Sequence, residues 1–166
     1  MERKILILSD THGFLHPNIF DIAESSDEIW HAGDWGTWDI LNELRATGKS
    51  VRGVFGNIDG WDIRQELPEF DRFQLDGKDI LITHIAGTPP SYNHKIMQIL
   101  KQNPPYMLIC GHTHILKVYH DKRYNMWYVN PGAAGKYGPQ KVSTVLQMFW
   151  NSNEGKPTRF RVIELP

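Results

Sequence analysis

The chain has 166 residues, 40% of them hydrophobic, and its 18 basic and 19 acidic residues leave a formal net charge of −1. This length fits one globular domain, and the near-neutral charge excludes an overall field that recruits long nucleic acid or an anionic membrane. The single cysteine, Cys110, excludes an internal disulfide and favours a reducing compartment, so we expect a cytoplasmic location. No apolar run approaches the roughly 20 residues that span a bilayer, so we expect no membrane segment.

The first sixty residues alternate between apolar strands and short helices. Strands are expected over residues 4–8, 27–31 and 50–55, each a β-rich apolar run. Helices are expected after Pro17 and after Thr37, where Pro suits a first helical turn and Thr suits an N-cap. Strands that alternate with helices in this way predict a parallel sheet.

The second half of the chain is richer in strands. Residues 72–75 and 79–83 flank an Asp-Gly pair and predict a β-hairpin. A helix is expected to open at Pro89-Pro90-Ser91. Further strands are expected over residues 106–110, 115–119, 126–130, 142–150 and 159–163. An α/β half followed by a mostly β half predicts an α/β fold, a four-layer α-β-β-α sandwich in which two packed mixed β-sheets are flanked by helices.

Several polar side chains stand directly after predicted strands, on what becomes the carboxyl edge of a sheet. They are Asp10, Asp34, Asn57, His84 and His112. Open α/β sheets bind ligands at that edge, so these residues are expected to converge. Two of the loops carry a further histidine, His12 and His114. Imidazole, carboxylate and amide oxygen together suit divalent ions such as Mn²⁺, Fe²⁺, Ni²⁺ or Zn²⁺, whereas Ca²⁺ prefers more oxygens.

The order of these motifs, D-x-H, G-D, G-N, H and G-H-x-H, resembles the calcineurin-like metallophosphoesterases, especially their small bacterial and archaeal phosphodiesterase branch. The resemblance covers nearly the whole chain, so residues 1–166 are expected to form a single metallophosphoesterase domain. It implies two divalent metal ions, with Mn²⁺ favoured and Ni²⁺, Fe²⁺ or Zn²⁺ as alternatives. The implied ligands are Asp10, His12 and His114 for the first ion, Asn57, His84 and His112 for the second, and Asp34 as the bridge.

The resemblance also implies in-line attack on phosphorus by a metal-bridging hydroxide, with Asp34, Asn57 and His84 at the reacting centre. The family commonly reads G-N-H-[DE], and its histidine donates a proton to the leaving group, but this chain has Ile58 at that position. Close relatives often continue with Gly and His after the ligand that His84 matches, where this chain has Ile85 and Ala86. Because poor leaving groups depend most on a proton donor, we expect phosphodiesters and activated aryl esters to be preferred over alkyl phosphomonoesters.

Four further residues have two interpretations each. His31 is either a hydrogen-bonding residue beneath the metal site or a packed residue at a strand end, and Asp59 is either a turn former or a carboxylate that supports the ligands. The segment from Asn130 to Gly135, which includes Gly132, resembles the branch's Asn-Pro-Gly loop. Its backbone N–H groups either face the metals or a substrate phosphate, or belong to an ordinary turn between strands.

The expected function is metal-dependent hydrolysis of a small phosphodiester or nucleotide-like substrate. One alternative is a weakly active or inactive scaffold that binds a phospho-ligand or a protein, as in the retromer subunit of this fold. The complete ligand set argues against it, whereas the missing proton donors keep it open. A nuclease or a cyclic nucleotide phosphodiesterase is another alternative, although no basic stripe is present to track long nucleic acid. The oligomeric state, including a homo-oligomer, stays open.

Overall fold

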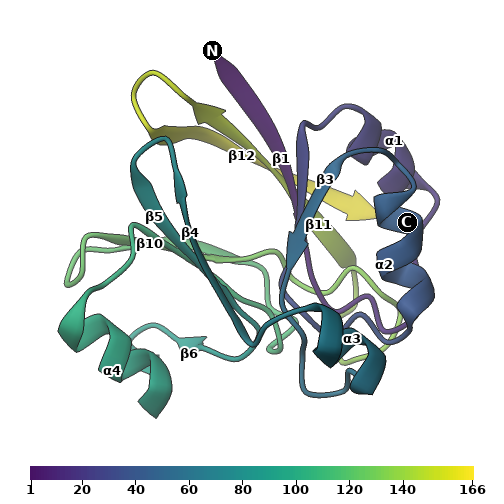
Figure 1. The fold of residues 1–166 in the computed structure, drawn as a ribbon, viewed down its shortest axis with the longest axis horizontal. Helices are drawn as coiled ribbons and strands as arrows, with labels where there is room; N and C mark the ends of the chain where they lie inside the picture. The colour runs from purple at the N-terminus through teal and green to yellow at the C-terminus, as the bar shows by residue number, and fades with distance from the viewer.

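The computed structural model describes all residues, 1–166, and contains four helices and twelve strands (Figure 1). The helices are α1 (Asn18–Glu24), α2 (Trp38–Arg45), α3 (Trp61–Glu66) and α4 (His94–Gln102). The strands of the first half are β1 (Glu2–Leu8), β2 (Glu28–His31), β3 (Ser50–Gly53), β4 (Phe70–Leu75) and β5 (Lys78–Thr83). The others are β6 (Gly87–Thr88), β7 (Ser91–Tyr92), β8 (Met107–Ile109), β9 (Lys117–Asp121), β10 (Met126–Asn130), β11 (Ser143–Asn151) and β12 (Lys156–Leu165).

Ten of the strands form two five-stranded sheets, ordered β12-β11-β1-β2-β3 and β4-β5-β8-β10-β9. In the first sheet β1, β2 and β3 run parallel, and in the second β5, β8 and β10 do. The pairings of β11 with β1 and β12, of β4 with β5 and of β9 with β10 are antiparallel. Both sheets are therefore mixed. The three parallel strands of each sheet end at the same edge of that sheet. The loops that follow these strands carry the candidate ligands.

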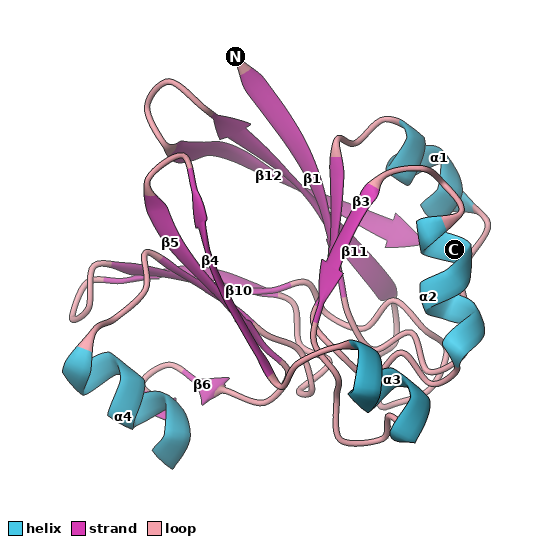
Figure 2. Ribbon diagram, viewed as in Figure 1, coloured by secondary structure: helices cyan, strands magenta, loops and turns pink.

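The two sheets face each other with helices on their outer sides (Figure 2). Along β1, Ile5 and Ile7 belong to the core between the sheets, whereas Leu6 and Leu8 belong to the core beneath α1 and α2. This alternation is the two-residue period of a strand buried on both faces. A third core joins the second sheet to α4 through residues such as Ile96. The predicted four-layer α-β-β-α sandwich is confirmed.

The structure differs from the sequence analysis at the start of α4 and in two elements that were not expected. The helix expected to open at Pro89-Pro90-Ser91 begins later, at His94, because residues 91–92 pair with Gly87 and Thr88 in a small hairpin. Asn93 is the N-cap, and its side-chain oxygen accepts a hydrogen bond from the Ile96 N–H. The short helix α3 and the β6–β7 hairpin were not predicted. No helix combines the length and the apolar character that a membrane crossing requires.

Candidate metal centre

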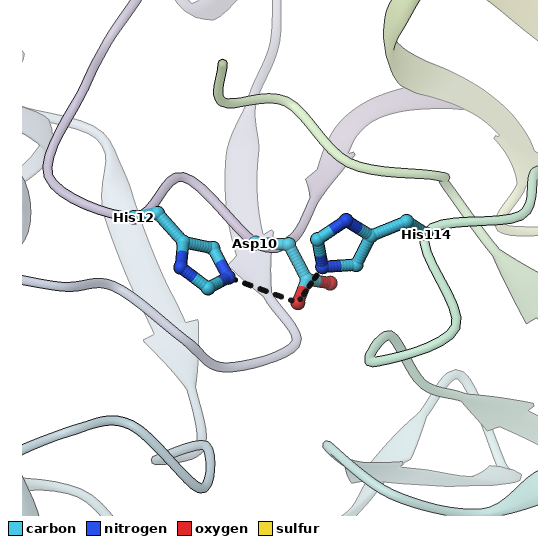
Figure 3. A group of neighbouring side chains, drawn as sticks. All are labelled: Asp10, His12 and His114. Atoms are coloured by element: carbon cyan, nitrogen blue, oxygen red, sulfur yellow. Dashed lines mark ion pairs between the residues drawn. The ribbon is translucent and has the colours of Figure 1, made fainter. Parts of the chain in front are cut away.

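Two loops that follow β1 and β8 bring together Asp10, His12 and His114, whose ligand atoms lie within 4.8 Å of one another. The His114 Nε2 is 3.1 Å from Asp10 Oδ1, and the His12 Nε2 is 3.7 Å from the same oxygen. Both rings turn a nitrogen toward the carboxylate (Figure 3). The other oxygen, Asp10 Oδ2, accepts hydrogen bonds from Ser9 and from the His112 N–H. We call these three side chains the first cluster.

Asp34, His84 and His112 form a second cluster, again with ligand atoms within 4.8 Å. Asn57 adjoins it, because its Oδ1 lies 3.0 Å from His112 Nδ1. The His84 Nδ1 lies 2.7 Å from the Ala32 carbonyl oxygen. A carbonyl only accepts, so Nδ1 donates and the lone pair of Nε2 faces the cluster.

Asp34 connects the two clusters. Its Oδ2 lies 3.4 Å from His12 Nε2 in the first cluster and 3.2 Å from His84 Nε2 in the second. Its Oδ1 accepts a hydrogen bond from the Ile58 N–H, which fixes the orientation of the carboxylate. Burial raises the pKa of Asp34, but the neighbouring His84 imidazole and the Ile58 N–H lower it more, so the net pKa lies below the ordinary value. An ionised oxygen therefore stands between the clusters.

Three buried atoms of these clusters have no hydrogen-bond partner: Asp10 Oδ1, His12 Nε2 and His84 Nε2. An unpartnered buried polar atom costs about 1–3 kcal/mol, so native proteins usually supply it with a partner. Divalent cations are partners for imidazole nitrogen and carboxylate oxygen alike. The donor set therefore fits two metal ions, one at each cluster.

The backbone at the site is strained. Five of the seven expected ligands, Asp10, His12, Asp34, His112 and His114, have φ between 45° and 70°. Residues other than Gly rarely adopt this left-handed conformation, which costs roughly 1–2 kcal/mol per residue. Such outliers gather at functional sites, where the surrounding structure holds them in place. Here all five lie in the loops that follow β1, β2 and β8.

Two glycines allow the ligands to approach the neighbouring loops. A Cβ at Gly33, where φ is +100°, would lie 2.7 Å from His84 Nδ1. A Cβ at Gly56 would collide with the Asp34 carboxylate. Both positions therefore exclude a side chain. The glycines in the H-A-G-D and G-N motifs are thus explained by packing against ligands.

Asp59 holds the two loops that carry Asp34 and Asn57. Its carboxylate accepts hydrogen bonds from three backbone N–H groups, at 3.0 Å from Asp34, 3.0 Å from Gly36 and 2.7 Å from Gly56. Burial raises the pKa of Asp59 more than these donors lower it. Of its two interpretations, the structure supports a carboxylate that positions the ligand loops.

His31 lies beneath the site and is fully buried. Its Nδ1 accepts a hydrogen bond from the Gly33 N–H, its Nε2 lies 3.0 Å from Thr11 Oγ1, and its ring stacks on Trp35 with centroids 3.7 Å apart. Nδ1 is therefore unprotonated. Both interpretations of His31 apply, since it packs in the core and also contacts the loops that carry ligands.

Burial lowers the pKa of His31 from 6.5 to about 3. The folded state therefore keeps His31 neutral at pH values where the unfolded chain takes up a proton. The contribution of His31 to the free energy of unfolding is complete above pH 6.5 and is lost as the pH falls below it. Metal-free wild type should lose up to about 1.4 kcal/mol of unfolding free energy per pH unit relative to His31→Gln. Urea denaturation at about pH 7.5 and about pH 5 measures this, and parallel losses in both proteins would exclude His31 as the cause.

Asn130 and Gly132 shape the loop beside the first cluster. The Asn130 side-chain NH₂ donates to the Gly111 carbonyl at 3.1 Å and to Thr113 Oγ1 at 3.0 Å, which braces the G-H-T-H turn. The Gly132 N–H donates to Asn130 Oδ1 at 3.0 Å. This N–H therefore points into its own loop, and the structure assigns it to the turn rather than to a metal or phosphate contact.

Gln140 is a residue of this site that sequence analysis missed. Its Nε2 donates to the carbonyl oxygens of Gly135 at 3.2 Å and Tyr137 at 2.8 Å, so its Oε1 faces His114 Nδ1 at 2.7 Å. His114 Nδ1 is thereby the donor, and Nε2 is left for the first cluster. Tyr137 covers the same cluster, since its ring stacks on His12 with centroids 5.0 Å apart.

Replacing Gln140 by Leu should weaken metal binding at the first cluster by about 10- to 100-fold, because His114 then loses the partner that fixes its tautomer. Competition with a chelating dye measures the affinity. Gln102→Leu, at an exposed position at the end of α4, is the matched control. Equal affinities for both variants would show that Gln140 only packs in its loop.

Comparisons with known proteins show the family and the fold of this chain. A sequence profile of the calcineurin-like phosphoesterase superfamily domain matches residues 3–151. No curated protein sequence matches the chain. Among solved structures, an archaeal phosphodiesterase is similar with a TM-score of 0.73 and 23% identity over 98% of this chain and 99% of the other.

Two further structures share the fold. A Vps29 variant from Entamoeba histolytica has a TM-score of 0.72 and 20% identity over 98% of this chain and 99% of the other. A predicted phosphoesterase from Streptococcus pneumoniae has a TM-score of 0.64 and 18% identity over 99% of this chain and 98% of the other. The profile covers most of the chain. The chain therefore belongs to the calcineurin-like phosphoesterase superfamily.

Proposed function

We propose that this protein is a metal-dependent phosphodiesterase that acts on small phosphodiesters and activated aryl phosphate esters. The observation that carries the proposal is the position of Asp34 Oδ2, between His12 Nε2 at 3.4 Å and His84 Nε2 at 3.2 Å. One ionised oxygen that adjoins two separate clusters suits a bridge between two divalent ions, with Mn²⁺ favoured among them. The archaeal phosphodiesterase of the same fold supports this reading.

The expected ligands form two sets, one for each ion. The first ion would be held by Asp10, His12 and His114. The second would be held by His84, His112 and Asn57, and Asp34 would contact both ions. When bound, such ions lower the pKa of a water nucleophile to about 7 and offset charge on the phosphate. Because Asp34 is fixed by the Ile58 N–H and His84 by the Ala32 carbonyl, little reorganisation accompanies the reaction.

Ile58 stands at the position where the family commonly has a proton-donating histidine. Ile58 is 46% exposed next to Asn57, and Ile85 is 41% exposed next to His84, so both expose apolar side chains where a donor would act. Leaving groups that are stable as anions need no proton in the transition state. This favours aryl esters and diesters with good leaving groups over alkyl phosphomonoesters, and it predicts modest turnover.

The test is hydrolysis of bis-aryl and mono-aryl phosphate esters by metal-stripped protein to which Mn²⁺, Ni²⁺, Zn²⁺ or Mg²⁺ is returned. We expect activity only after metal is restored, highest with Mn²⁺ and higher on the diester. Activity that persists in the stripped protein would refute the proposal.

The buried, unpaired Cys110 fits a cytoplasmic enzyme, where thiols stay reduced.

A binding scaffold is the second candidate, and the apolar exposure of Ile58 and Ile85 is the observation that favours it. Vps29 structures share the fold. If the metal-loaded protein binds aryl phosphates but hydrolyses none of them, the scaffold replaces the enzyme as the better account.

A further inference from the structure

A cavity of about 250 Å³ opens beside the second cluster. Asn57 and His84 line it, together with Phe55, Arg64, Glu69 and Ile85. A substrate phosphate held at Asn57 and His84 would therefore have this cavity next to it. Its volume is below the roughly 300–1,000 Å³ of typical ligand pockets, so it suits one small group.

Arg64, on α3, supplies an uncompensated positive charge to this cavity. Its Nε donates to the Asp59 carbonyl at 2.6 Å, and its Nη2 lies 3.3 Å from the carbonyl oxygens of Gly56 and Asn57. The guanidinium carbon lies 4.5 Å from the centroid of the Phe55 ring. These contacts fix the plane of the guanidinium. Its Nη1 makes no hydrogen bond within the chain, and no carboxylate forms an ion pair with Arg64.

The one acidic residue of the cavity, Glu69, forms no ion pair with Arg64. Glu69 Oε1 instead pairs with Lys95 Nζ at 2.8 Å. Arg64 thus adds positive charge next to ligands that would hold a divalent cation. An anion in the cavity would reduce the electrostatic repulsion between these two positive charges. With Nε and Nη2 engaged by backbone carbonyl oxygens, the N–H groups of Nη1 remain to donate charge-assisted hydrogen bonds to phosphate oxygens.

We propose that the Nη1 edge of Arg64 binds a second phosphate group of the substrate, so that the preferred substrates are phosphodiesters with a further phosphate on the arm that enters the cavity. This inference rests on the proposed function and specifies its substrate class. Arg64 is then a specificity-determining residue, and its contacts with backbone carbonyl oxygens hold the guanidinium at the cavity that it lines.

Two esters that release the same phenolate test the proposal: the p-nitrophenyl ester of thymidine 5′-phosphate, with and without a 3′-phosphate. Wild type should show kcat/KM about 10- to 100-fold higher with the 3′-phosphate, and Arg64→Gln should bring this ratio close to one. Arg161→Gln, which removes the same charge from an exposed position on β12, should keep the wild-type ratio. A wild-type ratio near one, or an Arg64→Gln variant that loses activity equally on both esters, would overturn the proposal.

A binding measurement separates this inference from the catalytic proposal. Calorimetry compares the affinities of metal-loaded wild type and Arg64→Gln for thymidine 5′-phosphate and thymidine 3′,5′-bisphosphate. We expect the bisphosphate to bind about 10- to 100-fold more tightly in wild type only. If that holds while neither ester is hydrolysed, the phosphate subsite stands and the phosphodiesterase proposal fails. Equal affinities in wild type would overturn the subsite.

Discussion

Replacing Asp34 by Asn is expected to lower kcat/KM for a bis-aryl phosphodiester by about 10²–10³-fold or more, because the site loses the ionised oxygen that lies between the clusters. The neutral amide keeps the shape of the carboxylate and can still accept from the Ile58 N–H. Its oxygen nevertheless binds a cation more weakly, so bound metal should also fall. Steady-state kinetics and elemental analysis of the same samples measure both effects.

Asp21→Asn is the matched control, since Asp21 is an exposed carboxylate on α1 outside both clusters. It should retain wild-type kcat/KM and metal content. If Asp34→Asn keeps full activity with its metal in place, the bridging role of Asp34 is wrong even if the fold and the other ligands are right.

The Ile58→His substitution is expected to raise hydrolysis of an alkyl phosphomonoester by about 10²-fold, since general acids contribute typically 10²–10⁴-fold. Ile58 is 46% exposed and directly follows Asn57, so an imidazole there can reach a leaving group without displacing core side chains. The rate of hydrolysis of activated aryl esters should change by only about two- to three-fold, because their leaving groups need no proton. The pH–rate profile for the alkyl ester should gain a limb near the ordinary histidine pKa.

Ile115→His controls for the mere addition of an imidazole. Ile115 is 66% exposed and directly follows His114, beside the first cluster. This variant should leave alkyl ester hydrolysis unchanged. Equal rates for wild type and Ile58→His, with full metal occupancy, would show that the missing donor does not limit the reaction.

Much of the fold could be predicted from the sequence, because its signals are local. The Asp76-Gly77 pair marked the β4–β5 hairpin, and both residues have positive φ as such a turn requires. Buried apolar runs marked the parallel strands. Their order along the chain placed the ligand loops at the sheet edges, and the structure brings all seven expected ligands into one site.

The features that were missed depend on contacts between distant segments. Helix α3 has six residues and no side-chain cap, and it is held by Arg64, which reaches back to the carbonyl of Asp59. Gln140 contacts His114 across 26 residues, from a loop that has no sequence pattern of its own. The start of α4 was misplaced because the short β6–β7 pairing, which has no apolar period, competes with the proline signal.

The number of metal ions that the protein binds tests the central claim most directly. Titration of metal-free protein with Mn²⁺, followed by calorimetry and native mass spectrometry, should show two ions per chain in wild type. His114→Ala, in the first cluster, and His112→Ala, in the second, should each retain one ion at the concentration that saturates wild type. A wild-type chain that binds one ion or none, or single variants that still bind two, would contradict a centre built from two clusters joined by Asp34.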